Sequence, residues 1–209
     1  MIDNFLTINK ILKFDNDDDF YMLQVIKRRK ENPEMETNSR VLKTTYLQSE
    51  GQLLKLKDDL VGLADRHNAR VYVNPSRKSF RKCTIACLKE FADRIACENY
   101  AKPYKIFDSV AGACGSNRAI WVVDVDWNEL DDVVFAGEFS LEMEQRIYIN
   151  KMCEFINTLK PDVDDKIVAV NRTVNGAHVL TTPFNAADFK QKYPNVTVHK
   201  NNPTLVYSK

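Results

Sequence analysis

The sequence predicts an α+β protein, in which a smaller αβ unit precedes a mixed sheet that has helices on its faces. From residue 119 onward the chain reads as strand, helix, strand, strand, helix and strand, the order of a ferredoxin-like domain, with one extra strand at the end. A strand and a helix over residues 70–97 precede it. Hydrophobic residues make up 44% of the 209 residues and charged residues 28%, a balance typical of globular proteins. We expect units over residues 1–118 and 119–209, together forming one compact domain.

The first half of the chain predicts short elements separated by polar loops. An acidic run at residues 15–19 precedes an apolar stretch that ends in basic residues. This charge order predicts a helix over residues 20–30, because helix dipoles favour acid first and base last. The elements expected after it are a loop over residues 31–40, a strand over 41–48, a helix capped by Ser49, a strand over 69–75, a helix from Ser76 to about Cys97, and irregular chain over 98–118.

The second half of the chain has sharper patterns. Residues 119–127 are rich in β-branched and aromatic side chains, which predicts a strand. An acidic connection over residues 128–139 leads to an amphipathic helix over 141–159. Two strands then meet at Asn175-Gly176, a dipeptide typical of hairpin turns. A helix over residues 185–193 and strands over 196–200 and 204–208 complete the expected order.

Bulk composition excludes several classes of protein. Lys and Arg number 30 against 29 Asp and Glu, so the net charge of +1 indicates no partner by itself. The five Cys are odd in number and lack zinc-site spacing, which favours reduced thiols and a cytoplasmic protein. No apolar run approaches the roughly 20 residues of a membrane helix, and the first ten residues do not resemble a secretory signal, so we expect no membrane association.

The most informative local feature is Asp124-Val125-Asp126 within an apolar strand. Residues two apart on a strand point to the same face, so these two carboxylates repel each other. A divalent cation such as Mg²⁺ or Mn²⁺ would relieve the repulsion, because hard cations prefer oxygen ligands. The alternative is a strand end at which both carboxylates are hydrated or paired with Arg.

Histidine is scarce in this chain, with only three residues. His178 follows Gly176-Ala177 at the start of a strand, where it is either a structural residue or a group that contacts phosphate beside a metal. His199 lies two strands later and is either a metal ligand or an exposed residue. His67 belongs to a basic tract.

That basic tract runs from Arg66 to Lys89 and contains no acidic residue. Its segregated charge, interleaved with Tyr72 and Phe80, indicates a surface for phosphates, to which a helix start after Ser76 would add backbone amides. The alternative is a solvated helix face balanced by the acidic residues 124–138. The cations of the tract are Arg66, Arg70, Arg77, Lys78, Arg81, Lys82 and Lys89.

These features together resemble a known family. An apolar strand with Asp124 and Asp126, a helix, a hairpin leading into His178, and a terminal strand pair resemble the catalytic core of the archaeo-eukaryotic primase superfamily, which includes primase-polymerases. The resemblance covers residues 66–209. The wider sequence is also similar to phage and mobile-element proteins that share the pattern NGAH…PF.

The resemblance implies an RRM-like sheet and a role in DNA replication. It implies that Asp124 and Asp126 are catalytic and hold Mg²⁺ or Mn²⁺, and that His178 contacts the nucleotide phosphates in the same cleft. The partners would be nucleic acid and nucleoside triphosphates, and the reaction would be primase-like or polymerase-like nucleotidyl transfer. The cations that would contact the phosphates are Arg70, Arg77, Lys78 and Arg81.

One departure from the family leaves other functions open. The third acidic residue of the family is missing, and Asn201 and Asn202 stand where it is expected. A non-catalytic RRM-like protein that binds nucleic acid is therefore an alternative, with Tyr72, Trp121 and Trp127 as candidates for base stacking. A metal-dependent nuclease is another, since two carboxylates and a His would also suit it.

Overall fold

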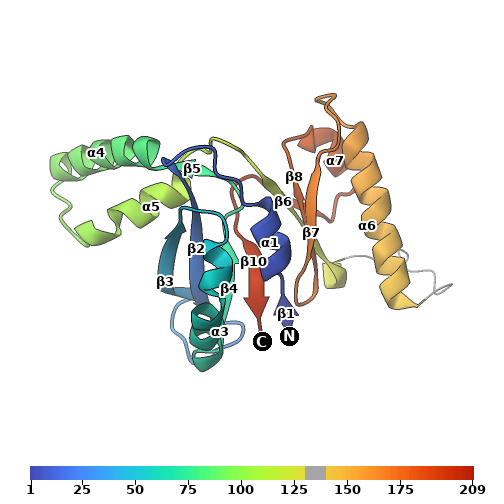
Figure 1. The fold of residues 1–209 in the computed structure, drawn as a ribbon, viewed down its shortest axis with the longest axis horizontal. Helices are drawn as coiled ribbons and strands as arrows, with labels where there is room; N and C mark the ends of the chain where they lie inside the picture. Colours follow the sequence, from blue (N-terminus) through green and yellow to red (C-terminus); the bar gives the residue numbers. More distant parts are fainter. Residues whose placement is uncertain (130–139) are drawn as a thin grey trace. The chain divides into compact units, whose positions relative to one another are not determined.

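The structure is a computed structural model that describes residues 1–129 and 140–209 (Figure 1). The chain divides into two compact units. The first consists of Met1–Ala119 and Pro203–Lys209, and the second of Ile120–Asn202. Most of the acidic connection expected over residues 128–139 lies outside the described residues.

The first unit contains an antiparallel sheet in the order β1-β10-β4-β2-β3. The long strand β2 pairs with β3 on one side and with β4 on the other, and the short β5 pairs with the start of β2. The strands of this sheet are β1 (Ile2–Asp3), β2 (Asp19–Arg28), β3 (Ser39–Leu47), β4 (Ala69–Val73), β5 (Lys78–Ser79) and β10 (Thr204–Ser208).

Helices of the first unit form two groups. α1 and α3 lie against β10, β4 and β2, whereas α4 and α5 form a hairpin that extends beyond the strands (Figure 1). No helix in the described ranges is long and apolar enough to cross a lipid bilayer. The helices are α1 (Phe5–Ile11), α2 (Gln52–Lys55), α3 (Lys57–Arg66), α4 (Phe80–Ala96), the 3₁₀ helix η1 (Pro103–Lys105) and α5 (Ile106–Ala113).

The helix predicted over residues 20–30 is wrong, because this segment forms β2. Its first residues are buried on both faces of the sheet, Phe20 and Met22 on one face and Tyr21 and Leu23 on the other. A strand covered on both faces shows an uninterrupted apolar run, which cannot be distinguished from a buried helix by its periodicity. The acidic run before it therefore starts no helix at residue 20, and its Asp18 bonds to the start of α4 instead.

Three further boundaries in the first unit differ from the prediction. The helix expected from Ser49 is divided at Leu56 into α2 and α3, and Gly51 occupies the cap position. The long helix begins at Phe80, after the short β5, and the side chain that caps it belongs to Ser79 instead of Ser76. The stretch predicted to be irregular contains α5, whose Ile106 and Ala111 are buried.

The second unit contains an antiparallel sheet in the order β7-β8-β6-β9. The residues Val123, Val125 and Val179 of this sheet pack with Met152 and Ile156 of α6 in one hydrophobic core. The elements are β6 (Trp121–Asp126), the 3₁₀ helix η2 (Trp127–Glu129), α6 (Leu141–Thr158), β7 (Ile167–Arg172), β8 (Gly176–Thr181), α7 (Ala186–Lys192) and β9 (Thr197–His199).

The described strand pairs are all antiparallel, so the expectation of a mixed sheet is wrong. In the second unit, the parallel strands β6 and β7 are separated by β8 and never pair. The expectation that residues 204–208 extend this same sheet is also wrong, because β10 pairs with β1 and β4 in the first unit. All five residues of β10 are buried, which suits an interior strand position.

Candidate functional site

Strand β6 presents two carboxylates on one face of its sheet. Val123 and Val125 point into the core with α6, so alternation places Asp124 and Asp126 on the opposite face. The side chain of Asp124 is 39% exposed. The carboxylates of β6 are therefore held by a buried strand but remain accessible to a ligand.

His178 lies next to Asp124 because β6 and β8 are neighbouring antiparallel strands. The two residues are paired in the register, and Nε2 of His178 lies 3.3 Å from Oδ1 of Asp124. The His178 side chain is only 13% exposed. The structure thus brings together the predicted carboxylate of Asp124 and the predicted imidazole of His178. The two side chains form an ion pair when the imidazole is protonated.

A second imidazole approaches Asp124 from the other side. His199 ends β9, which pairs with β6, and its Nε2 lies 3.9 Å from Oδ2 of Asp124. The sequence allows two roles for His199, a metal ligand or an exposed residue, and does not indicate that it lies beside Asp124. Alternation along β9 contained the signal, because Val198 packs in the core and its neighbours Thr197 and His199 point to the opposite face.

Polar residues form a row across this face of the sheet. Asp124 pairs in the register with His178 of β8 and with Thr197 of β9, and His178 pairs with Asn171 of β7. Each of the four strands therefore contributes one polar residue at the same level. Asn171 is fully buried.

Asp126 has a local role besides its place beside Asp124. Its Oδ1 accepts a hydrogen bond of 3.1 Å from the backbone N–H of Asn128, which ties the carboxylate to the turn after β6. Opposite Asp126 in the register is Gly176. A Cβ atom on Gly176 would lie 1.8 Å from the carbonyl oxygen of Val125, so only glycine allows β8 to approach β6 so closely.

The predicted hairpin is present, but its glycine has another function than the one expected. Thr173 donates its N–H to the carbonyl oxygen of Gly176 at 2.9 Å, which closes the turn between β7 and β8. The Asn-Gly signal usually reflects positive φ angles at both residues. Neither Asn175 nor Gly176 has a positive φ, so the glycine serves close packing in this hairpin.

The four cations expected to contact phosphates lie in the first unit, and three of them have partners there. Nη2 of Arg70 lies 2.6 Å from Oε1 of Glu31. Lys78 is fully buried and donates from Nζ to the carbonyl oxygen of Cys114 at 2.8 Å. Arg77 is buried against Asp15 of the loop before β2 and Asp19 at the start of β2, whereas Arg81 is exposed.

The start of α4 is capped by the protein's own carboxylate. Oδ1 of Asp18 accepts the N–H of Arg81 at 2.7 Å, and the hydroxyl of Ser79 donates to Oδ2 of Asp18. Hydrogen bonding by Ser79 and Arg81 lowers the pKa of Asp18. The amides that were expected to bind phosphate at a helix start are therefore used within the first unit.

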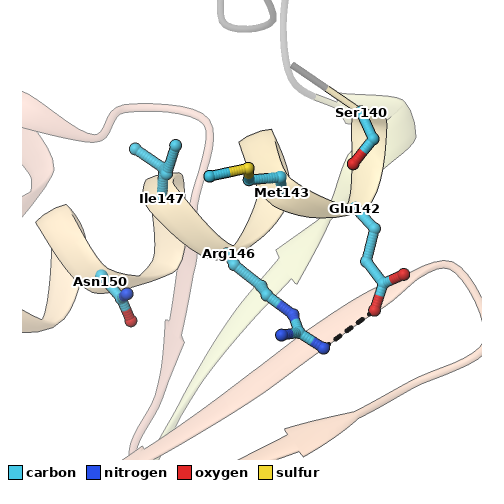
Figure 2. Close-up of a pocket in the computed structure, with 6 residues that line it drawn as sticks. All are labelled: Ser140, Glu142, Met143, Arg146, Ile147 and Asn150. Atoms are coloured by element: carbon cyan, nitrogen blue, oxygen red, sulfur yellow. Dashed lines mark hydrogen bonds and ion pairs between the residues drawn. The ribbon is translucent and has the colours of Figure 1, made fainter.

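A shallow hollow lies along one side of α6, and none of the predicted site residues lines it. Its volume is about 430 Å³ (Figure 2). Arg146 and Glu142 form an ion pair of 3.0 Å along its wall. The described residues that line it are Ser140, Glu142, Met143, Arg146, Ile147 and Asn150.

Comparisons with known proteins do not extend this description. No protein-family model, curated protein or solved structure matches the chain. Over residues 1–129 and 140–209, no three His, Cys, Asp or Glu residues are grouped closely enough to hold a metal ion as they stand. Asn201 and Asn202 follow β9 after Lys200, at the end of the second unit.

Proposed function

We propose that the second unit is an RRM-like domain of the ferredoxin-like class, with its ligand site on the sheet face opposite its helices. Its elements follow the order strand, helix, strand, strand, helix and strand, which is typical of that class. Its strands follow the order β7-β8-β6-β9, so each helical connection crosses over one intervening strand. Both features support the proposal.

On this domain we propose primase-like nucleotidyl transfer, in which nucleoside triphosphates extend a nucleic-acid strand. The observation on which the proposal depends is the place of Asp124 between two imidazoles, His178 at 3.3 Å and His199 at 3.9 Å. Asp126 adds a second carboxylate on the same face. Carboxylates and imidazoles gathered around the half-exposed Asp124 suit the binding of charged phosphate groups and their counter-ions.

The side chains at the site include ligands for a divalent cation, provided that one of them changes its orientation. Asp124 and Asp126 offer carboxylate oxygens, the ligands that suit Mg²⁺ or Mn²⁺, whereas the imidazole nitrogen of His199 is a ligand that softer transition metals prefer. Asp126 would have to turn from the N–H of Asn128 to reach a cation shared with Asp124. A bound cation would supply neutralisation of phosphate charge. His178, when protonated, can donate its Nε2–H to a phosphate oxygen.

Arg70, Arg77 and Lys78 have no phosphate contact in this proposed site, because each is paired or hydrogen-bonded within the first unit. Arg81 is exposed, and it remains a candidate for contact with nucleic acid. Its contribution would be electrostatic, since an exposed Arg binds phosphates without reading bases.

A non-catalytic RRM-like function is less well supported, because the expected stacking aromatics are occupied. Trp121 packs edge-on against Phe184, and Trp127 packs against Tyr148. Both tryptophans belong to the core on the helix side of the sheet. Tyr72 is largely buried in the first unit. A face without stacking aromatics suits phosphate chemistry better than the binding of bases.

Binding of metal and nucleotide is the first test of the proposed site. Mn²⁺ together with a nucleoside triphosphate should raise the unfolding temperature of the wild-type protein by a few degrees at saturation. Asp124→Asn should abolish this rise, whereas Asp162→Asn, at an exposed aspartate outside the site, should retain it. A rise that Asp124→Asn leaves intact would overturn the assignment of the site.

Activity is the second test and separates the remaining functions. A labelled single-stranded template with a primer and nucleoside triphosphates should yield longer strands in Mn²⁺ or Mg²⁺, and Asp124→Asn should abolish them. Shortened template in place of extension would identify a nuclease. Binding of nucleotide without either product would identify a relative without catalysis, for which the loss of the third acid at Asn201 and Asn202 gives a reason.

A further inference from the structure

Helix α4 exposes an unusual amount of apolar surface. One face of the helix is buried and includes Cys83 and Cys87. A second face, which adjoins the buried one, is also apolar, although it is open to solvent. Its large side chains are Ile85 at 60% exposure, Leu88 at 66%, Phe91 at 40% and Ile95 at 61%.

The spacing of these residues is that of a helix seam. They recur at steps of three, three and four residues, and Ala92 lies among them. Such a stripe follows one side of a helix and is typical of helices that pair with another helix. Contiguous exposed apolar patches of this kind usually mark interaction sites. The α4–α5 hairpin extends beyond the strands of the first unit, so this face runs along a projecting helix (Figure 1).

The charges beside the stripe divide between the two halves of the helix. Basic Lys82 and Lys89 lie in the N-terminal half, and acidic Asp93 and Glu98 lie toward and just beyond the C-terminal end. These four residues are exposed, as is Arg81 in the basic half, whereas Glu90 and Arg94 pair with each other at 2.8 Å within the helix. Two such helices placed antiparallel would set the basic half of each against the acidic half of the other.

We propose that α4 pairs with α4 of a second copy of this chain, antiparallel about a two-fold axis near residue 90. In that register Ile85 faces Ile95 of the second copy, and Leu88 faces Ala92. Lys89 then lies beside Asp93 of the second copy, twice in the dimer by symmetry. The charge pattern favours a second copy over an unrelated helix, because it complements itself.

The seam is short, which sets the expected strength of the dimer. The 17 residues of α4 span about 25 Å. An interface built on one such helix lies at the lower end of the size range of specific interfaces, so we expect a dissociation constant in the micromolar range. The dimer should therefore dissociate on dilution.

Sedimentation equilibrium of the full chain tests the seam. The wild-type protein should change from monomer to dimer over about a hundredfold range of concentration. Leu88→Lys should weaken the dimer by more than about tenfold, because it places a charge at the centre of the seam. Val163→Lys, at an exposed valine of the second unit, should leave the dimer unchanged. A wild-type monomer at every concentration, or a dimer that tolerates Leu88→Lys, would overturn the proposal.

A charge exchange tests the antiparallel register. Lys89→Glu and Asp93→Lys should each weaken the dimer about tenfold, since each creates two like-charge contacts. The double variant should restore the wild-type constant. Both positions are exposed on one helix, so circular dichroism and the unfolding temperature should stay close to wild type. Failure of the double variant to recover dimerisation would overturn the register.

Discussion

Arg77 directs its guanidinium toward the buried carboxylate of Asp19, with Nη1 3.4 Å from Oδ2. The same guanidinium lies 2.5 Å from Oδ2 of Asp15 and donates to the carbonyl oxygen of Lys13 at 3.2 Å. Oδ2 of Asp19 also accepts backbone N–H groups from Asp15 and Asn16. This cluster fixes the acidic loop before β2 to the segment that leads into α4.

Removal of the guanidinium should destabilise the first unit strongly. Arg77→Met leaves the buried Asp19 without its cation, which should lower the free energy of unfolding by about 3–5 kcal/mol. Urea denaturation followed by circular dichroism measures the loss. Arg81→Met, at an exposed neighbour, should change stability by no more than about 0.5 kcal/mol. Equal stability of the two variants would show that Asp19 does not depend on Arg77.

The stability of the protein should decline in acid because carboxylates of the same loop become protonated. The hydrogen bond from Arg77 lowers the pKa of Asp15, and the bond from Ser79 is the main cause that lowers the pKa of Asp18. A carboxyl whose pKa is lower in the folded state stabilises the protein above its unfolded pKa of about 3.9. This contribution is lost as pH falls below about 4 and protons bind.

The loop carboxylates can be tested one at a time. Asp18→Asn should flatten the decline of the urea midpoint below about pH 4, because residue 18 no longer binds a proton there. Asp17→Asn, at an exposed neighbour in the same loop, is the matched control. A pH profile of Asp18→Asn identical to that of wild type would exclude Asp18 as a source of the acid sensitivity.

The second unit follows closely from local patterns in the sequence. Strands β6, β7, β8 and β9 and helices α6 and α7 were all predicted, whereas the short η2 was not. Pairing between distant segments has no local signal. The five residues of β10, of which Leu205, Val206 and Tyr207 are apolar, therefore gave no indication that they pair with β4 instead of β9.

The candidate site was predicted only in part for the same reason, because contacts between distant segments have no local signal. Asp124 and His178 could be predicted to lie together, because in a ferredoxin-like order the strand after the hairpin pairs with the first strand, as β8 does with β6. The basic tract misled because its acidic partners are remote in sequence: Glu31 pairs with Arg70, and Asp15 with Arg77. The net charge of a sequence segment does not include acidic partners that lie outside that segment.

Thiol reactivity should distinguish one cysteine from the rest. Cys97 is exposed, whereas burial, with a hydrogen bond to Cys114, raises the pKa of Cys83 to about 12. Burial also raises the pKa of Cys153 to about 11, and the pKa of Cys87 is raised for the same reason. A buried neutral thiol reacts slowly, since the thiolate is the nucleophile.

A disulfide reagent at about pH 8 should therefore modify one thiol rapidly in the native protein. Cys97→Ser should remove this fast phase, and the buried thiols should react only in denaturant. Cys114→Ser, at a half-buried position, should leave the fast phase in place. A fast phase that survives Cys97→Ser would show that the packing around Cys83 or Cys153 opens readily.

The contact between Gly176 and Val125 links the stability of the second unit to its candidate site. Gly176→Ala would place a Cβ atom 1.8 Å from the Val125 carbonyl oxygen, so β8 must move away from β6. We expect a loss of about 2–3 kcal/mol in unfolding free energy. The shift would also separate His178 from Asp124, since both lie on these strands. The variant should therefore lose the stabilisation by Mn²⁺ and nucleotide that the proposed site predicts.

Gly112→Ala is the matched control for this substitution. Gly112 lies in α5, where an added Cβ atom meets no described atom within 4 Å. Because alanine has the higher helix propensity, Gly112→Ala should raise stability by up to about 1 kcal/mol. Urea denaturation of both variants, with and without Mn²⁺ and nucleotide, makes the comparison. A Gly176→Ala protein with wild-type stability would show that β6 and β8 can separate without cost, and that the 3.3 Å pair of Asp124 and His178 is not held by their close approach.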